Sequence, residues 1–315
     1  MIRFRSIVSL CILVFALAAS APGVAAESPA LLPSVAERIQ GLERNEGLLT
    51  LYFDRQRGDV YLELPPAADP DQGHQFLYVE GIVTGLGSND VGLDRGQIGP
   101  ARLVGLRRVG GRVFVEEVNL SYRAISEDLH EQRAVRQSFA RSVLWGGAIE
   151  AENEDGTVLV DFTSFLVRDA HGSARRLERA RQGKFSLDTS RSAVQMDDCL
   201  VFPENIELEA LLTVHGSQPG AYVRQTAPSP EWVTMVQHHS FLKLPDDGYR
   251  PREFDPRSGS NEISFFDYAA PLDQPIETRW IVRHRLEKTD PYAERSTVVE
   301  PIVYYVDRGV PEPVR

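Results

Sequence analysis

Seven histidines are the first residues to test for catalysis or metal binding. The segment His130–Ala134, HEQRA, begins like the HExxH motif of zinc proteases, but Ala134 stands where the second histidine is required. A helical zinc site needs two imidazoles one turn apart, with the glutamate as the base. His130 is therefore not expected to bind zinc. The histidines are His74, His130, His171, His215, His238, His239 and His284.

Two of the histidines are adjacent, in the segment Gln237–Ser240. Neighbouring residues of a β-strand point to opposite faces, so His238 and His239 are not expected to share one metal ion. A buried or hydrogen-bonded structural role is favoured for both. One enzymatic alternative stays open, a hydrolase in which His238 or His239 acts with Asp90 or Asp94.

Nucleophile motifs give no better candidate. The sequence has no GxSxG segment, which would place a serine on a strand-to-helix turn. Cys199 follows two aspartates in MDDCLVF, and nearby carboxylates raise the pKa of a thiol, which disfavours a nucleophilic thiolate. The segment Leu187–Ser190, LDTS, resembles an aspartic-protease loop, but that chemistry needs two such carboxylates. The sequence therefore predicts no catalytic, metal-binding or cofactor-binding residue.

The glycine-rich segment Thr84–Gly99, TGLGSNDVGLDRGQIG, is the most distinctive stretch of the chain. Glycine permits a positive φ, and Asn89, Asp90 and Asp94 can close tight turns through their side chains. Phosphate or calcium binding is an alternative, but the segment matches neither a P-loop nor an EF-hand. A structural loop, with Arg95 paired to an acid, is the favoured interpretation.

The N-terminus has the features of a secretory signal peptide, residues 1–26. Arg3 and Arg5 precede the apolar stretch Ile7–Ala19, and small residues allow cleavage after Ala26. The apolar stretch is short for a membrane-spanning helix, so the protein is expected to be exported, to the periplasm or the medium, without a membrane span after cleavage. Cleavage leaves Cys199 as the remaining cysteine, and the fold then has to rest on its hydrophobic core.

Charge argues against a nucleic-acid partner. The 315-residue chain has a formal net charge of −11, whereas phosphate binding requires clustered lysines and arginines. The densest basic stretch, Arg175–Arg181, is interrupted by Glu178 and is interpreted as a solvated face or turn.

Period-two alternation of apolar residues predicts a mainly β fold, with antiparallel sheets in a sandwich- or barrel-like arrangement and a few short helices. Alternating apolar sets identify four strands. Turns are predicted at Gln56–Asp59, Arg108–Val113 and Asn153–Gly156, and helices at Glu127–Arg141 and Leu31–Leu42. The four sets are Val60, Leu62 and Leu64; Val158, Val160 and Phe162; Ile206, Leu208, Ala210, Leu212 and Val214; and Trp280, Val282, His284 and Leu286.

Seven segments, in their order along the chain, resemble a family of exported bacterial zinc-dependent metalloproteases. In that family, domains of unknown function precede a metzincin-like catalytic domain. The resemblance covers nearly all of the chain after residue 26, with one departure at Ser260–Phe266, SNEISFF, where the family tends to have aromatic and glycine residues. The segments are GLGSNDVGLDRGQIG, RAVRQSFARSVLWGG, VDFTSFLVRDAHG, LDTSRSAV, QHHSFLKLPDDGYRPREFDPRSG, IVRHRLEKTDP and PIVYYVDRGVPEPVR.

The resemblance implies a division of the chain and a role. Residues 27–48 are expected to form a short helical segment, 49–230 a β-rich domain, 231–300 a second β-rich part of the same region, and 301–315 the start of a catalytic domain that is missing here. Zinc and the catalytic residues are expected only in that missing domain. The chain is then a truncated, non-catalytic N-terminal accessory region.

Its expected partners are the missing catalytic domain and a peptide or protein substrate. A free-standing periplasmic or surface module that binds peptides or proteins is the alternative. In either case Ile302, Tyr304 and Val306 are expected to begin a sheet whose other strands are absent, which leaves an exposed strand edge.

Overall fold

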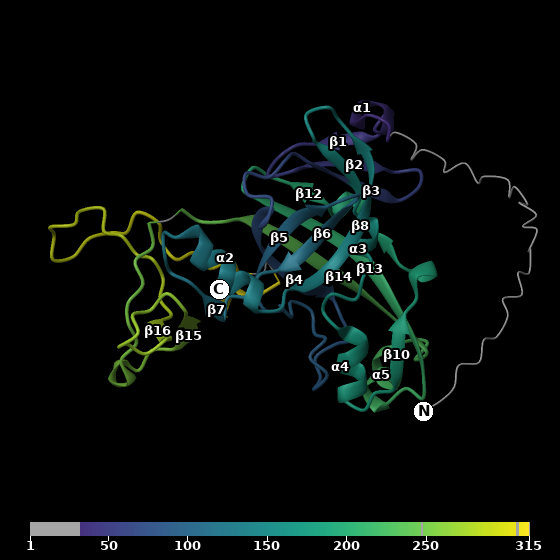
Figure 1. The fold of residues 1–315 in the computed structure, drawn as a ribbon. Helices are drawn as coiled ribbons and strands as arrows, with labels where there is room; N and C mark the ends of the chain where they lie inside the picture. Colours follow the sequence, from purple (N-terminus) through teal and green to yellow (C-terminus); the bar gives the residue numbers. More distant parts are fainter. Residues whose placement is uncertain (1–31, 247, 307–308, 315) are drawn as a thin grey trace, which may run out of the picture. The chain divides into compact units, whose positions relative to one another are not determined.

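The fold is dominated by one antiparallel sheet that curls until it nearly closes as a barrel (Figure 1). The computed structural model describes residues 32–246, 248–306 and 309–314. Within these ranges the sheet has 13 strands, two of which, β11 (Ala193–Val194) and β12 (Leu200–Val201), pair only with β13. The other strands follow the order β1 (Glu43–Asn45), β2 (Thr50–Asp54), β3 (Asp59–Leu64), β9 (Val158–Asp161), β8 (Ser142–Glu152), β6 (Arg112–Glu117), β5 (Arg102–Val109), β4 (His74–Thr84), β14 (Trp232–Lys243), β13 (Asn205–Ser217) and β10 (Lys184–Leu187).

A second sheet is smaller and mixed. It contains β16 (Glu277–Ile281), β15 (Glu262–Asp267) and β7 (Tyr122–Arg123), in that order, and β15 pairs in parallel with β7. Helices are short throughout the described residues. They are α1 (Val35–Arg38), α2 (Leu129–Ser138), α3 (Thr163–Leu166), α4 (Ser173–Arg179) and α5 (Ala221–Thr226), with 3-10 turns at Thr189–Arg191, Met196–Asp198, Pro256–Ser258 and Glu312–Val314.

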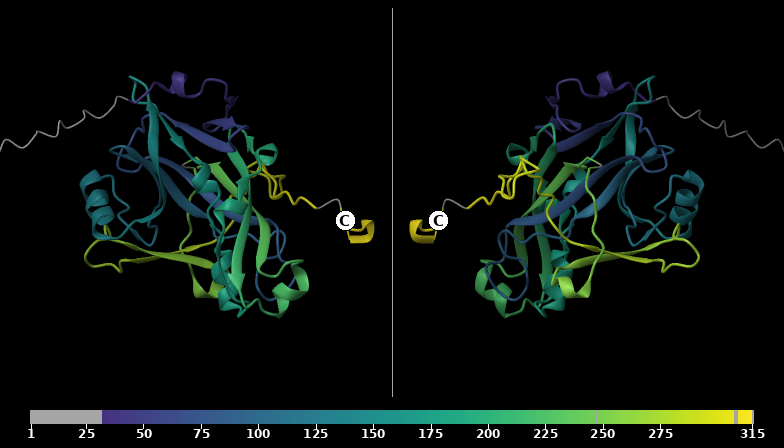
Figure 2. Two further views of the ribbon diagram at one scale, coloured as in Figure 1. Left: turned by 90° about the vertical axis from the view of Figure 1, so that its right-hand side faces the viewer. Right: turned by 90° about the vertical axis from the view of Figure 1, so that its left-hand side faces the viewer.

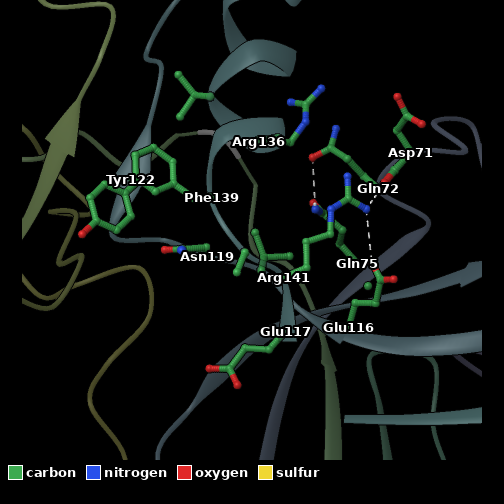
Figure 3. A pocket seen from close by; sticks show the side chains of 14 residues that line it. Asp71, Gln72, Gln75, Glu116, Glu117, Asn119, Tyr122, Arg136, Phe139 and Arg141 are labelled. Atoms are coloured by element: carbon green, nitrogen blue, oxygen red, sulfur yellow. Dashed lines mark hydrogen bonds and ion pairs between the residues drawn. The ribbon is translucent and has the colours of Figure 1, made fainter. Parts of the chain in front are cut away.

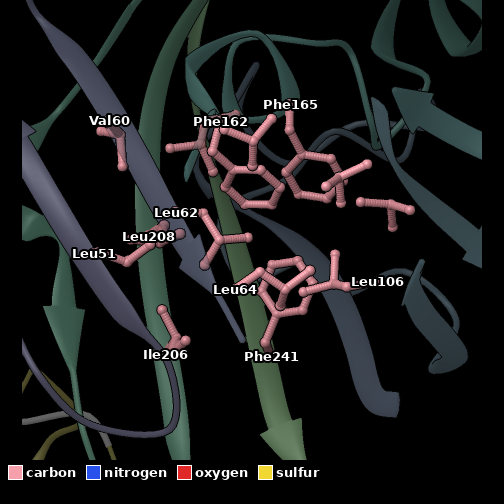
Figure 4. Close-up of a cluster of buried hydrophobic side chains, with 14 of the residues drawn as sticks. Leu51, Val60, Leu62, Leu64, Leu106, Phe162, Phe165, Ile206, Leu208 and Phe241 are labelled. Carbon is pink, nitrogen blue, oxygen red and sulfur yellow. The ribbon is translucent and has the colours of Figure 1, made fainter. Parts of the chain in front are cut away.

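The main hydrophobic core fills the inside of the curled sheet (Figure 4). Leu51 and Leu62, near one end of the strand order, lie in the same cluster as Ile206 and Leu208, near the other end. Figure 2 shows the curled sheet from two further sides. A flat sheet would keep these strands apart, so the shared core is the physical result of the curling.

The predicted β pattern is confirmed, and its turns connect consecutive strands. The two-residue Gly110–Gly111 turn joins β5 to β6, Asn153–Gly156 lies in the turn between β8 and β9, and residues 55–58 join β2 to β3. The apolar face of β13 is buried, as its alternation predicts. Tyr61, on the other face of β3, is buried as well, because it packs against Val35 of α1.

One predicted strand face is wrong. β16 ends at Ile281, and the residues after it, including Val282, His284 and Leu286, are exposed and outside any strand. His284 is therefore not a core histidine. The alternation is present in the sequence, but no layer packs on that face within the described residues.

The predicted division of the chain can be compared with the described helices and strands. The signal peptide, 1–26, lies outside the described residues, and the predicted helical segment 27–48 contains the single turn of α1 and then the strand β1. The predicted boundary at 230/231 falls between β13 and β14, which pair along eleven registered positions from Asn205–Leu242 to His215–Trp232. The described residues from Pro33 onward form one compact unit, and the expected parts 49–230 and 231–300 both lie within it. Among the described residues, no helix is both long enough and apolar enough to cross a membrane.

Candidate functional site

A pocket lies between the helix α2 and the outer face of the hairpin β5–β6 (Figure 3). It contains about 520 Å³ of atom-free space, part of it open to solvent. Its wall combines charged, amide and aromatic side chains. The lining residues are Asp71, Gln72, Gln75, Gly105, Glu116, Glu117, Val118, Asn119, Tyr122, Val135, Arg136, Phe139, Ala140 and Arg141.

Helix α2 forms one wall because its sequence fixes where the helix begins and which side faces inward. Asp128 caps the N-terminus by accepting a hydrogen bond from the amide of His130. Val135 is the buried position of the helix, and Arg136 follows it at the pocket. The helix ends at Ser138, and the extended Phe139 turns the chain toward β8.

An aromatic pair forms the apolar side of the pocket. The rings of Tyr122 and Phe139 are stacked, with centroids 3.8 Å apart and an interplanar angle of 6°. Phe266 of β15 stacks on Tyr122, and Tyr268 contacts both members of the pair. Tyr122 belongs to β7 of the second sheet, so the second sheet positions the pair beside the end of α2.

The floor of the pocket is a buried carboxylate held by two arginines. Arg107 donates two hydrogen bonds to Glu116, at 3.0 and 2.6 Å, and Nη1 of Arg141 donates a third, at 3.2 Å. Burial alone would raise the pKa of Glu116, but the two guanidinium groups hold that pKa below its ordinary value. The carboxylate of Glu116 is thus paired with two guanidinium groups.

Two arginines of the pocket keep unused hydrogen-bond donors. Within the described residues, Arg141 uses only Nη1, which also donates to the carbonyl of Asp71, and Arg136 donates only to Gln132. In Figure 3 both guanidinium groups lie to one side of the Tyr122–Phe139 pair. The pocket therefore sets free cationic donors beside an apolar wall.

The sequence predicted no site residue, although it does indicate that Arg107 and Glu116 of this pocket floor lie close together. The Gly110–Gly111 turn places Gly105 opposite Glu116, so that Arg107 lies diagonally across from Glu116 on the same face. Arg141 had no such signal. It lies near Glu116 because β8, which begins at the next residue, pairs with β6 so that Ser142 is opposite Glu117.

The adjacent histidines lie on opposite faces of β14, as strand geometry predicts. His238 is on the outer face, where Nε2 lies 2.6 Å from Glu207 and Nδ1 lies 3.3 Å from Glu209. The hydrogen bond to Glu207 raises the pKa of His238 above its ordinary value, against the opposing effect of burial.

His239 is fully buried on the inner face of the barrel. Its Nδ1 lies 2.8 Å from the Tyr78 hydroxyl, and its Nε2 lies 2.9 Å from the carbonyl of Leu166. Burial lowers the pKa of His239 to about 3, so the ring is neutral at pH 7. Arg168 donates to the same Tyr78 hydroxyl at 3.0 Å, which completes a polar cluster beside the apolar core.

The two aspartates considered as catalytic partners have other contacts. Asp90 accepts a hydrogen bond from the Tyr222 hydroxyl, and Asp94 accepts one from the amide of Asn89. Within the described ranges, neither His238 nor His239 contacts either aspartate. In the same ranges, no group of three or more histidine, cysteine, aspartate or glutamate residues is arranged to hold a metal ion.

The Thr84–Gly99 segment folds back along β4. The amide of Ile82 donates to the carbonyl of Gln97, and the amide of Gly99 donates to the carbonyl of Glu80. Gly99 has to lack a side chain here, because a Cβ atom would lie 2.1 Å from Oε1 of Glu80. Apolar residues anchor the middle of the segment in a second core cluster. They are Leu86, Val91 and Leu93.

The other predicted positions are exposed or inert. His130 is exposed on α2, and Cys199 is buried, which raises the pKa of its thiol to about 11. Asp188 of the LDTS segment caps the 3-10 turn Thr189–Arg191 by accepting a hydrogen bond from the amide of Ser190. Arg176 of the basic stretch donates to the carbonyl of His171, from within α4.

The segment Pro301–Val306 is extended and exposed, and is drawn in yellow in Figure 2. Tyr304 is 84% exposed and Tyr305 is 95% exposed. Within the described part of the chain, no backbone–backbone hydrogen bond involves this segment. Five consecutive apolar or aromatic residues, Ile302–Val306, are thus exposed and make no backbone–backbone hydrogen bond to any other described residue.

Comparison with known families gives one match. Residues 96–289 match the family described as Domain of unknown function (DUF5117), and the match covers more than half of the chain. It includes most of the main sheet from β5 onward, the helix α2 and the second sheet. No curated protein and no solved structure matches the chain.

Proposed function

The chain belongs to the DUF5117 family, and we propose that it is the non-catalytic accessory region of an exported zinc-dependent metalloprotease. In this proposal it docks onto the catalytic domain by strand addition through Ile302–Val306. The order of the seven segments that resemble such proteases supports the role. The structural observation that carries the proposal is the exposed, unpaired state of Ile302–Val306.

The residue types of this segment favour strand addition over simple surface contact. As a strand, the segment would carry apolar or aromatic side chains on both faces, because Ile302, Tyr304 and Val306 alternate with Val303 and Tyr305. A strand with a single buried face would alternate with polar residues, whereas a continuous apolar run is typical of a strand covered on both faces. The partner would supply the backbone hydrogen bonds for the added strand. It would also supply an apolar layer on each face of that strand.

Two edge strands of the chain's own sheets, β1 and β16, are less suitable for strand addition. The edge strand β1 has three residues, Glu43, Arg44 and Asn45, which are polar or charged, and short charged edges resist pairing with another chain. On the second sheet, β16 is already bridged to Glu253. Strand addition through Ile302–Val306 is therefore the mode that the exposed backbone supports best.

Hydrogen–deuterium exchange tests this proposal. The purified chain is mixed with a separately produced catalytic domain from the metalloprotease family that it resembles. The amides of residues 302–306 should exchange quickly in the chain alone and become protected in the mixture, because a ladder of backbone hydrogen bonds would form. Unchanged exchange at these amides, at concentrations where the catalytic domain is folded and active, would overturn the proposal.

Two variants at exposed tyrosines, one inside the docking segment and one outside it, test whether the segment itself makes the contact. Tyr304 and Tyr292 are 84% and 98% exposed, and only Tyr304 lies in the docking segment. Tyr304→Asp should weaken the complex at least tenfold, because a carboxylate would have to be buried, whereas Tyr292→Asp should leave it unchanged. A different result would support the alternative, a free-standing peptide-binding module. In that case Ile302–Val306 would bind unrelated extended peptides, and no catalytic domain would protect its amides from exchange.

A further inference from the structure

We infer that the pocket beneath α2 binds a carboxylate attached to an apolar body, the chemistry of a peptide C-terminus that ends in an apolar residue. This inference does not depend on the proposed accessory role. It rests on the juxtaposition of the free donors of Arg136 and Arg141 with the stacked pair Tyr122 and Phe139 (Figure 3).

Three carboxylates line the pocket, those of Asp71, Glu116 and Glu117, and each of them has an arginine partner. Glu116 is already satisfied by three hydrogen bonds from Arg107 and Arg141, and Arg102 lies 3.6 Å from the carboxylate of Glu117. Within the described residues, Arg136 makes no ion pair. A bound anion would therefore meet Arg136 and the outer edge of Arg141 without displacing an existing carboxylate.

The geometry of the donors favours a carboxylate among anions. Nε and Nη2 of Arg141 make no hydrogen bond within the described residues, and these two groups form one edge of the guanidinium fork. Such an edge matches the two oxygens of a carboxylate, which can accept two parallel hydrogen bonds. Arg136 adds a second cation from the helix above.

The apolar wall selects what the carboxylate is attached to. The Tyr122–Phe139 pair is braced by Phe266, so its surface is rigid before a ligand arrives. A rigid aromatic surface recovers apolar contact area at low cost in conformational entropy. The side chain of a terminal leucine or phenylalanine would lie on this wall while its α-carboxylate meets the arginines.

Isothermal titration calorimetry tests the inference with defined probes. The full chain is titrated with an N-acetylated tetrapeptide ending in phenylalanine and with the same peptide as its C-terminal amide. The free acid should bind at least tenfold more tightly, because the amide lacks the charge-assisted hydrogen bonds. Equal binding of acid and amide, or no binding of the acid at millimolar concentration, would overturn the inference.

Variants locate the binding. Arg141→Gln and Arg136→Gln should each weaken acid binding at least tenfold and leave the weaker amide binding unchanged. Arg136→Gln is the safer of the two, because Arg136 does not contact Glu116. Arg179→Gln, at an exposed position of α4 outside the pocket lining, is the matched control and should bind like the natural chain. Loss of acid binding in the control as well would place the effect outside the pocket.

A third probe identifies the source of the carboxylate. 3-Phenylpropionate carries the same carboxylate and ring without a peptide backbone. Binding as tight as that of the peptide would support a free carboxylic acid as the ligand, and tighter binding of the peptide would support a peptide C-terminus. Whichever probe binds more tightly, its binding should be weakened by Arg136→Gln. Binding that persists in that variant would contradict the assigned site.

Discussion

The amide of Leu48 donates a hydrogen bond of 2.7 Å to the carbonyl of Phe202. Leu48 precedes β2 near one end of the strand order, and Phe202 follows β12, which pairs with β13 near the other end. Arg55 and Asp197 make an ion pair across the same junction, at 2.7 Å. The two ends of the sheet therefore meet here, and the contact is what nearly closes the barrel.

The closing contact requires a glycine at position 47. A Cβ atom there would lie 2.5 Å from the Phe202 carbonyl oxygen and 2.7 Å from a methyl group of Val201. We expect Gly47→Ala to lower the free energy of unfolding by about 1–3 kcal/mol, because backbone has to shift to relieve the clash. Chemical denaturation monitored by circular dichroism measures the change.

Gly111→Ala is the matched control for this prediction. A Cβ atom at Gly111 would have no neighbour within 4 Å, and Gly111 does not have a positive φ. We therefore expect a change of less than about 0.5 kcal/mol, as for an ordinary surface position. Equal destabilisation by the two substitutions would show that the junction at Gly47 is not a tight contact.

This junction marks the limit of what the sequence predicts about the fold. Alternation predicts the strands of the β5–β6 hairpin, and the Gly110–Gly111 turn fixes their register, because both signals are local. The contact between Leu48 and Phe202 joins segments far apart in the chain, and no local pattern encodes it. The same distinction holds for the pocket, where the Arg107–Glu116 pair follows from the hairpin but the approach of Arg141 does not.

The buried pair Arg107–Glu116 should contribute far more to stability than its exposed neighbour Arg108–Glu152. Both pairs have two hydrogen bonds, but the Glu116 side chain is 8% exposed and that of Glu152 is 33% exposed. Glu116→Gln leaves two guanidinium groups with a neutral partner in a poorly hydrated place. We expect it to lower the free energy of unfolding by about 3–5 kcal/mol.

Glu152→Gln supplies the control for Glu116→Gln. Solvent screens the exposed pair, so its loss should change the free energy of unfolding by no more than about 1 kcal/mol. Urea denaturation of the two variants in the same buffer makes the comparison. If Glu152→Gln were the more damaging substitution, the assignment of Glu116 as the buried anchor of the pocket floor would be wrong.

The Tyr78 hydroxyl should stabilise the polar cluster inside the barrel. It lies 2.8 Å from Nδ1 of His239 and accepts a hydrogen bond from Arg168 at 3.0 Å. Tyr78→Phe keeps the ring but leaves both partners without that contact in a buried place. We expect a loss of about 1–3 kcal/mol in the free energy of unfolding. Tyr292→Phe, at a residue that is 98% exposed, should have no measurable effect in the same denaturation experiment.

The outer histidine of β14 should make stability depend on pH near neutrality. Its hydrogen bond to Glu207, with a further contribution from Glu209, raises the pKa of His238 in the folded protein above the value of about 6.5 that is usual for an unfolded chain. Protonated His238 is thus favoured by folding. Its contribution to stability is fully present below about pH 6.5 and is lost as the pH rises through the folded pKa.

The variant His238→Gln isolates this effect, because it removes this imidazole and leaves the rest of the sequence unchanged. His239 acts in the opposite direction, since its pKa is lowered to about 3 and its neutral form is favoured by folding, so its influence falls in the acidic range. Melting temperatures of both proteins between pH 6 and 9 provide the test. The advantage of the natural chain over His238→Gln should shrink steadily as the pH rises. A constant difference across this range would mean that His238 is not protonated beside Glu207 and Glu209, and that the cluster on the outer face of β13 and β14 holds a neutral imidazole.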